Sequence, residues 1–167
     1  MKKVAIVMGS RSDWEVMRDA FTTLREFEVP VVVRVLSAHR TPAELDDFLL
    51  WAVKNDVGVI IPGAGGAAHL PGVIASKTVL PVIGVPCKSS ISLEGLDSLL
   101  SIVQMPPGIP VATVGINNSR NAALLAISIL ALSDTSLKNR LEEYRAGLRK
   151  RVLEDDKKLR AELQSQP

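Results

Sequence analysis

Five short apolar runs divide this chain at regular intervals, and they constrain its fold more than any other feature. They recur roughly every 25–28 residues. The runs are Val4–Met8, Val31–Leu36, Val57–Pro62, Val82–Val85 and Val111–Gly115. Each run is nearly continuous rather than alternating, which is typical of strands covered on both faces of a parallel sheet. Because the intervals are long enough for a helix, the spacing predicts repeated βα units.

Helical periodicity fills the intervals between these runs. In Trp14–Phe27 the apolar residues recur at helical spacing, and Asp13 stands at the N-cap position. The next interval has Thr41 as its expected cap, Pro42 in the first turn, and an apolar face made of Leu45, Phe48, Leu49 and Ala52. Three further helices are expected over Pro71–Lys77, Leu96–Val103 and Asn121–Leu132.

The last two helical segments carry different apolar patterns. Residues 121–132 are apolar around most of the circumference, which predicts a buried helix. A charged helix over about residues 134–163 follows and keeps only a narrow apolar stripe, consisting of Leu137, Leu141, Tyr144, Leu148 and Val152. Because this stripe lies beyond the last strand, we expect it to pack on a neighbour, in the same chain or in another subunit.

Length and composition limit the architecture. With 167 residues and 47% hydrophobic content, the chain can bury one sizeable core but is too short for two ordinary domains. We therefore expect a single α/β domain over residues 1–167, doubly wound around a parallel sheet with right-handed connections. In such folds the ligand lies at the carboxyl ends of the strands.

Several kinds of partner are disfavoured. The apolar run after Lys3 is too short for a secretory signal core, and prolines interrupt the longest apolar stretches, so we expect a cytoplasmic protein that does not enter a membrane. Basic residues near the C-terminus alternate with acidic ones, which favours a solvated helix face over a nucleic-acid surface. One cysteine and two histidines offer neither a disulfide nor a zinc spacing.

The segment Gly9-Ser10-Arg11-Ser12-Asp13 follows the first predicted strand and opens the first helix. Backbone N–H groups at a helix start and two serine hydroxyls suit a phosphate. Asp13 would repel a phosphate, so we expect its carboxylate to accept hydrogen bonds from ribose hydroxyls. The alternative is that Ser12 or Asp13 only caps the helix.

The segment Ser37-Ala38-His39-Arg40-Thr41-Pro42 follows the second predicted strand. An imidazole that can give and take a proton near neutral pH stands here beside a guanidinium that can bind phosphate through two hydrogen bonds. The alternative is a histidine in an ordinary surface loop. The position at a strand's carboxyl end favours proton chemistry on a phosphorylated substrate.

A third segment, Gly63 to Gly72, is rich in glycine and alanine and follows the third predicted strand. It matches the dinucleotide-binding fingerprint only weakly and lacks the acidic residue expected about 20 positions later, so we expect no nicotinamide cofactor. Small residues here would let the backbone approach a flat ligand and hold a carboxylate or carbon dioxide with N–H groups. His69 could either touch the ligand or satisfy carbonyls under the loop.

Cys87 and the loop at residues 104–108 each allow two interpretations. Cys87 has no adjacent base and no glycine-flanked turn, which favours a buried small hydrophobe over a nucleophile. The stiff loop at residues 104–108 could be a plain connector or a wall of the site.

Taken together, five ordered motifs closely resemble the N5-carboxyaminoimidazole ribonucleotide mutase family of purine biosynthesis. They are Gly9–Asp13, Ser37–Pro42, Gly63–Gly72, Gly95–Pro106 and Asn121–Ala126. The resemblance covers nearly the whole chain. It implies a flavodoxin-like three-layer α/β/α sandwich, a homo-octamer with sites where subunits meet, and no metal or organic cofactor.

The resemblance also implies a reaction, in which a carboxylate moves from the exocyclic nitrogen of the imidazole ribonucleotide to ring carbon 4 through trapped carbon dioxide. It assigns His39 as the general acid and base. It assigns substrate binding to Ser10, Ser12, Asp13, Ser37, Ala38, Arg40, Gly63, Ala64, Gly66, His69 and Leu70. In this assignment the serines and Arg40 hold the phosphate, Asp13 the ribose, and the glycine-rich segment with His69 the carboxylate.

One departure and three alternatives accompany the resemblance. The loop before Asn121 is shorter than in many members of the family. A related class carboxylates the amine with free carbon dioxide, although Gly65–Pro71 resembles the mutase pattern. A flavin mononucleotide electron carrier could use the same fold, but three Phe, two Trp and one Tyr are few rings for flavin stacking. A non-catalytic nucleotide sensor would make His39 dispensable.

Overall fold

The computed structural model describes residues 1–90 and 92–165. Five strands within these residues form one parallel sheet. Its strands are β1 (Lys3–Met8), β2 (Val31–Val35), β3 (Val57–Gly65), β4 (Ile83–Cys87) and β5 (Ala112–Thr113). Their order is β2-β1-β3-β4-β5, which is the flavodoxin-like order with its switch point between β1 and β3. The predicted fold class is confirmed.

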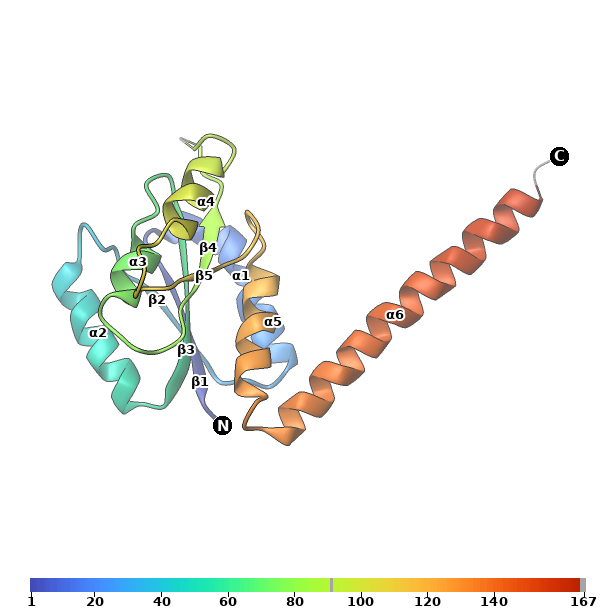
Figure 1. Ribbon diagram of the computed structural model, residues 1–167, viewed down its shortest axis with the longest axis horizontal. Coiled ribbons are helices and arrows are strands. Elements are labelled where there is room, and N and C mark those ends of the chain that lie inside the picture. Colours follow the sequence, from blue (N-terminus) through green and yellow to red (C-terminus); the bar gives the residue numbers. More distant parts are fainter. Residues whose placement is uncertain (91, 166–167) are drawn as a thin grey trace.

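Helices cover both faces of this sheet (Figure 1). The helical elements are η1 (Arg11–Asp13), α1 (Trp14–Glu26), α2 (Pro42–Lys54), α3 (Leu70–Ala75), α4 (Leu96–Val103), α5 (Ser119–Leu130) and α6 (Thr135–Gln164). One face packs against α1, α5 and the start of α6, and the other against α2, α3 and α4. The alternation of side chains along β1 shows why both faces are apolar, since Ile6 and Met8 enter the first core and Ala5 and Val7 the second.

The ends of β3 and β5 differ most from the sequence prediction. β3 continues through Gly65, three residues beyond the predicted end, because Gly63–Gly65 pairs in register with Val85–Cys87 of β4. The glycines suggested a loop, but pairing with β4 extends the strand. β5 is shorter than predicted, with only Ala112 and Thr113 in the ladder, since it is an edge strand that pairs with β4 alone.

Asp13 and Thr41 stand at the predicted N-cap positions, but neither side chain makes the predicted cap hydrogen bond. Asp13 occupies the N-cap position of α1 without a side-chain cap bond, and its carboxylate instead accepts the backbone N–H of Ser10 in a capping box around η1. Thr41 precedes α2, but its hydroxyl accepts the N–H of Ser37 and donates to the Ser37 carbonyl. Both side chains thus brace the loops that carry the polar motifs.

Burial of α5 is one-sided, whereas the sequence predicted a buried helix. Its inner face is fully buried through Ala122, Ala123, Ala126 and Ile127. Leu125 on the other side is 38% exposed. The single chain therefore leaves part of this apolar circumference uncovered.

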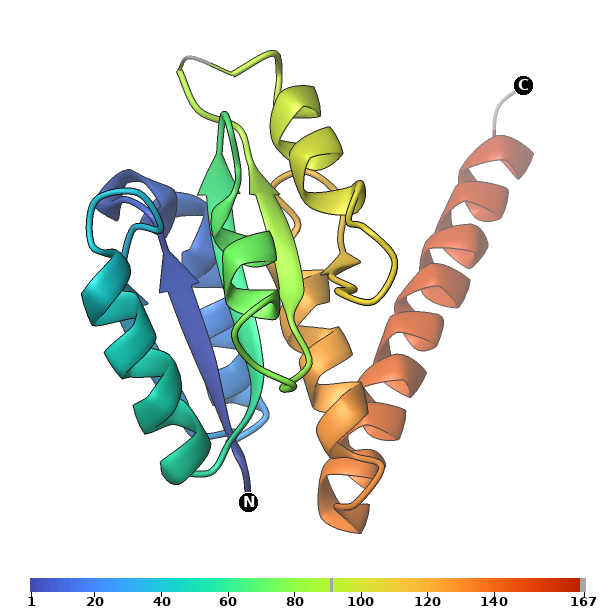
Figure 2. The same ribbon diagram turned by 60° about the vertical axis from the view of Figure 1, so that its left-hand side comes forward.

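The predicted C-terminal helix is confirmed as α6, which begins after an Asp134 cap and runs away from the domain (Figure 2). Leu137 and Leu141 are buried, and Tyr144 packs edge-on against Phe27. Beyond them Val152 is 67% exposed. Only the first part of the stripe therefore packs within the chain. Among residues 1–90 and 92–165, no helix is both long enough and apolar enough to cross a membrane.

One buried hydroxyl joins α5 to α1. The Ser119 hydroxyl accepts a hydrogen bond from the N–H of Ala20 at 3.1 Å and donates one to the carbonyl of Val16 at 2.5 Å. These two backbone groups are four residues apart and would pair with each other in an ordinary helix. Ser119 is fully buried, so the hydroxyl is a polar contact between two helices inside the core.

We predict that Ser119→Ala lowers the free energy of unfolding by about 1–3 kcal/mol, because two buried backbone groups lose a partner. Urea denaturation followed by circular dichroism measures this change. Ser128→Ala is the matched control on the same helix, since the Ser128 hydroxyl bonds only to the Leu124 carbonyl one turn earlier. An equal loss in both variants would contradict a special role for Ser119.

Candidate functional site

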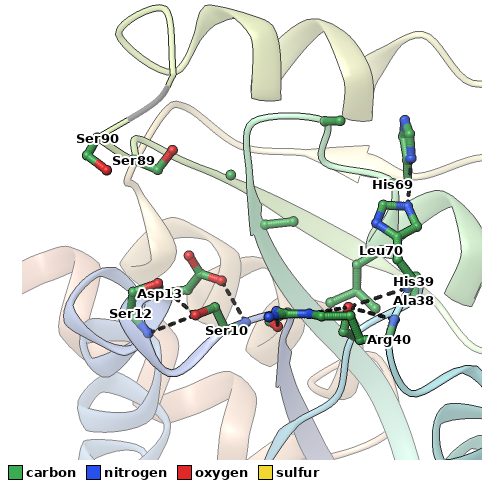
Figure 3. Close-up of a pocket in the computed structure, with 15 residues that line it drawn as sticks. Ser10, Ser12, Asp13, Ala38, His39, Arg40, His69, Leu70, Ser89 and Ser90 are labelled. Atoms are coloured by element: carbon green, nitrogen blue, oxygen red, sulfur yellow. Dashed lines mark hydrogen bonds between the residues drawn. The ribbon is translucent and has the colours of Figure 1, made fainter.

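The three polar motifs converge at the carboxyl ends of β1, β2 and β3, around a cavity of about 470 Å³ (Figure 3). This is the switch point of the sheet, where adjacent loops diverge and leave a crevice. The lining residues are Gly9, Ser10, Ser12, Asp13, Ser37, Ala38, His39, Arg40, Ala64, Gly65, Ala67, His69, Leu70, Ser89 and Ser90.

Two predicted site residues, Gly63 and Gly66, do not line this cavity. Gly63 is buried within β3, and a Cβ there would lie 2.4 Å from the Met17 sulfur. Glycine at this position therefore allows α1 to pack closely on the sheet. Gly66 has a φ of +60°, so it turns the chain out of β3 toward the lining residue Ala67.

One wall of the cavity is rich in hydrogen-bond donors. The Ser12 hydroxyl donates to that of Ser10 at 2.8 Å, so both oxygens lie close together at the start of η1. Arg40 donates through Nη2 to the Gly9 carbonyl at 2.8 Å and through Nε to the Ser37 hydroxyl at 3.4 Å. These bonds tie the loop after β2 to the loop after β1 and orient a cation beside two hydroxyls, which suits an anion such as phosphate.

Asp13 lies beside this wall and is partly buried. Burial raises the pKa of its carboxyl above the ordinary value of 3.8, while the Ser10 N–H and the nearby Arg40 charge act in the opposite direction. Desolvation is the largest of these effects. The ionised carboxyl is thus partly desolvated, and hydrogen bonds from hydroxyl donors of a ligand would stabilise it.

The two histidines of the chain meet in the cavity, although 30 residues separate them. His39 Nε2 and His69 Nδ1 are 2.9 Å apart, and the rings lie edge to face with centroids 5.0 Å apart. One nitrogen donates and the other accepts, so the pair holds a proton between the rings. Of the two readings of His69, the geometry favours contact with the ligand cavity. The sequence offered no signal for this pairing.

Sequence reasoning missed the contribution of β4. Ser89 and Ser90 follow this strand and line the same cavity. Their signal was present in the sequence, since β4 neighbours β3 and its carboxyl end must lie at the same edge.

Cys87 is packed in the core, as predicted. It is 1% exposed, and burial together with the Asp13 charge raises the pKa of its thiol to about 12. Its sulfur donates to the Val85 carbonyl. A thiol in this state is a poor nucleophile. The loop at residues 104–108 is absent from the cavity lining, and its Met105 lies beside Gly72 of α3 instead.

The aromatic rings pair with one another away from the cavity. The pairs are Trp14–Phe21, Phe27–Tyr144 and Phe48–Trp51. Because none of these rings belongs to the lining set, the cavity offers no aromatic platform for a flavin. In the described part of the chain, no group of three His, Cys, Asp or Glu side chains is placed to hold a metal ion.

The fold and the cavity together define a flavodoxin-like α/β protein with a two-histidine site at its switch point. Comparison with known proteins gives the family. Residues 3–151 match the family model described as AIR carboxylase, and the chain belongs to this family.

Curated relatives cover most of the chain. It is 58% identical over 146 residues to the N5-carboxyaminoimidazole ribonucleotide mutase of Mycobacterium leprae. The aligned region covers 87% of this chain and 85% of that protein. It is 56% identical over 150 residues to the protein of the same name from Pyrococcus abyssi, covering 90% and 86%. It is also 52% identical to the phosphoribosylaminoimidazole carboxylase of Saccharomyces cerevisiae, over 93% of this chain and 27% of that protein.

A solved structure supports the architecture. The crystal structure of Treponema denticola PurE superposes with a TM-score of 0.85 at 29% identity, covering 95% of this chain and 99% of that one. The three-layer fold is therefore shared over nearly the whole length.

We predict that Asp13→Asn raises the thermal unfolding midpoint at pH 7, because asparagine keeps an acceptor for the Ser10 N–H without a buried charge. The folded pKa of Asp13 is raised, so the wild type loses stability as pH rises from 3.8 through the folded pKa. The gain should therefore be small near pH 4 and largest above the folded pKa.

Thermal scans between pH 4 and pH 8 measure this difference. Asp19→Asn, which removes an exposed carboxylate from α1, is the matched control for the loss of one negative charge. A lower midpoint for Asp13→Asn at pH 7 would show that attraction to Arg40 outweighs the cost of burial.

Proposed function

We propose that this protein is a mutase that interconverts N5-carboxyaminoimidazole ribonucleotide and 4-carboxy-5-aminoimidazole ribonucleotide in purine biosynthesis, and that it acts in the cytoplasm. The observation that carries the proposal is the pairing of His39 with His69 in a cavity that is also lined by Arg40 and five serines. The relatives that bear the mutase name match this chain at 50–58% identity.

The donor wall is the proposed phosphate site. The hydroxyls of Ser10, Ser12 and Ser37 and the guanidinium of Arg40 converge there, and their mutual bonds orient them before a ligand arrives. The carboxylate of Asp13, which follows Ser12 in the chain, would accept hydrogen bonds from the ribose hydroxyls. Its raised pKa is consistent with a carboxylate that gains donors when the nucleotide binds.

The histidine pair is the proposed proton carrier. Loss of carbon dioxide from the exocyclic nitrogen requires a proton at that nitrogen, and attack of carbon 4 on the carbon dioxide releases a proton from carbon 4. The two transfers balance, so one imidazole can donate and then recover the same proton. We assign this role to His39, with His69 holding its ring through the 2.9 Å bond.

The end of β3 is the proposed carbon dioxide wall. Ala64 is 7% exposed and Leu70 3% exposed, so these two lining residues are tightly packed. Ala38 completes the lining on the β2 side. Gly63 and Gly66 do not line the cavity, but Gly63 lets α1 pack on β3 and Gly66 turns the chain toward Ala67. A closely packed wall would retain carbon dioxide between the two steps.

A second candidate is a carboxylase that uses free carbon dioxide and the amine. It is favoured by the description of the family model and by the name of the Saccharomyces cerevisiae relative. The two activities share the second step and differ in whether the carboxylated amine is a substrate.

We predict rapid conversion of carboxyaminoimidazole ribonucleotide and slow conversion of aminoimidazole ribonucleotide plus bicarbonate, both followed by absorbance. His39→Asn should lower turnover about 10²–10⁴-fold while nucleotide binding persists, because proton transfer is lost and the phosphate wall is intact. Turnover only with the amine would select the carboxylase. Near-normal turnover in His39→Asn would remove this histidine from the mechanism.

We propose that the protein assembles as a homo-oligomer, an octamer by resemblance to its family. The support lies in apolar surface that the single chain leaves exposed. It includes Leu125 of α5 and the outer stripe of α6, namely Leu148, Val152, Leu153, Leu159 and Leu163. A helix with such a stripe gains stability by packing on another subunit.

We predict that a chain ending after Gly147 folds but forms a smaller assembly, because Leu137, Leu141 and Tyr144 stay in the core while the outer stripe is removed. Light scattering measures the assembly, and circular dichroism checks the fold. An unchanged assembly would show that α6 beyond residue 147 does not join subunits.

A further inference from the structure

The loop after β4 contains a polar atom that its own packing does not use. Ser89 Oγ is buried and has no hydrogen-bond partner. Within residues 1–90 and 92–165, no other buried side-chain oxygen or nitrogen lacks one. The backbone of Ser89 is satisfied, since its N–H donates to the Ser92 hydroxyl at 3.0 Å and its carbonyl accepts from the same hydroxyl at 2.9 Å. The loop is thus held by Ser92, and the Ser89 hydroxyl is left over.

Ser89 lies in the wall of the cavity, beside the end of β3. A Cβ placed on Gly65 would lie 3.2 Å from the Ser89 Cβ and 3.4 Å from its oxygen. Figure 3 shows Ser89 across the cavity from His39 and His69. The unused hydroxyl and the histidine pair therefore bound the cavity from two sides, with the end of β3 between them.

The neighbouring charges restrict what this corner can bind. The ammonium of Lys88 pairs with Glu94, and the donor wall around Arg40 supplies the groups suited to phosphate. What remains beside Gly65 is a neutral donor. A neutral donor can orient a carboxylate without the strong ground-state stabilisation that a fixed cation would add, which suits a carboxylate that must leave as carbon dioxide.

We propose, resting on the proposed function, that the Ser89 hydroxyl donates a hydrogen bond to the carboxylate of the bound ribonucleotide. Ser89 is then a substrate-binding residue that distinguishes carboxylated from uncarboxylated imidazole. Glycine at position 65 leaves the space that this contact needs. The orphaned hydroxyl of the ligand-free protein acquires its partner on binding.

The test is Ser89→Ala, with binding measured by isothermal titration calorimetry. Affinity for 4-carboxy-5-aminoimidazole ribonucleotide should fall about tenfold or more, the usual loss for a hydrogen bond to a charged group. Affinity for 5-aminoimidazole ribonucleotide, which lacks the carboxylate, should not change. The ligand-free variant should unfold at the same temperature as the wild type or higher, because an unpaired buried hydroxyl is removed.

Equal losses for both nucleotides, no loss for either, or a lower unfolding temperature would each overturn the proposal. Ser90→Ala is the control for a substitution in the same loop, since Ser90 is exposed and the bonds from Ser92 to Ser89 remain, and it should not discriminate between the two nucleotides. Discrimination by Ser90→Ala equal to that of Ser89→Ala would also overturn the proposal.

The wild type separates this proposal from the proposed function. A wild-type protein that neither binds nor converts the carboxylated nucleotide would refute the proposed function, and the Ser89 assignment with it. A wild type that converts it, together with a Ser89→Ala variant that behaves identically, would refute the Ser89 assignment alone.

Discussion

The parallel pairing of β1 with β2 on one side and β3 on the other is the constraint on which the rest of the structure depends. Met8, at the end of β1, stands in register with Val35 and Gly63. β1 and β2 therefore end at the same level and β3 continues to Gly65, and the loops that follow these strands leave the sheet on opposite faces. Because the polar motifs of the cavity directly follow these strand ends, the pairing of the strands brings the motifs together. The close packing of Met17 on Gly63 keeps α1, and with it the Ser10–Asp13 turn, against the same edge.

The site sets local stability against chemistry. Asp13 keeps a carboxyl whose pKa burial raises, and Ser89 keeps a buried hydroxyl without a partner. In a protein that bound no ligand, other residues at these two positions would cost the fold less stability. By contrast Arg40 is bonded to Ser37 and to the Gly9 carbonyl, and Ser12 is bonded to Ser10, so the donor wall is oriented before a ligand arrives. The cavity thus combines preformed donors with groups that gain partners only from a ligand.

Sequence patterns predicted the fold class and most elements because apolar periodicity reports burial directly. Residues 96–103 form α4 as expected, and the apolar face of α2 is buried as expected. The errors have local causes. Gly63–Gly65 suggested a loop, yet pairing with β4 keeps it in the sheet. Asp13 and Thr41 stood at cap positions, yet nearby loop N–H groups compete for their side chains.

The sequence by itself determined the order of strands and helices and the three polar motifs at strand ends, because both follow from local periodicity and from the direction of parallel strands. Only the tertiary structure decided which side chains meet. The bond between His39 and His69 and the position of Ser89 beside Gly65 join segments from different strands. Such contacts depend on register and on packing distances of a few ångströms, which no local pattern encodes.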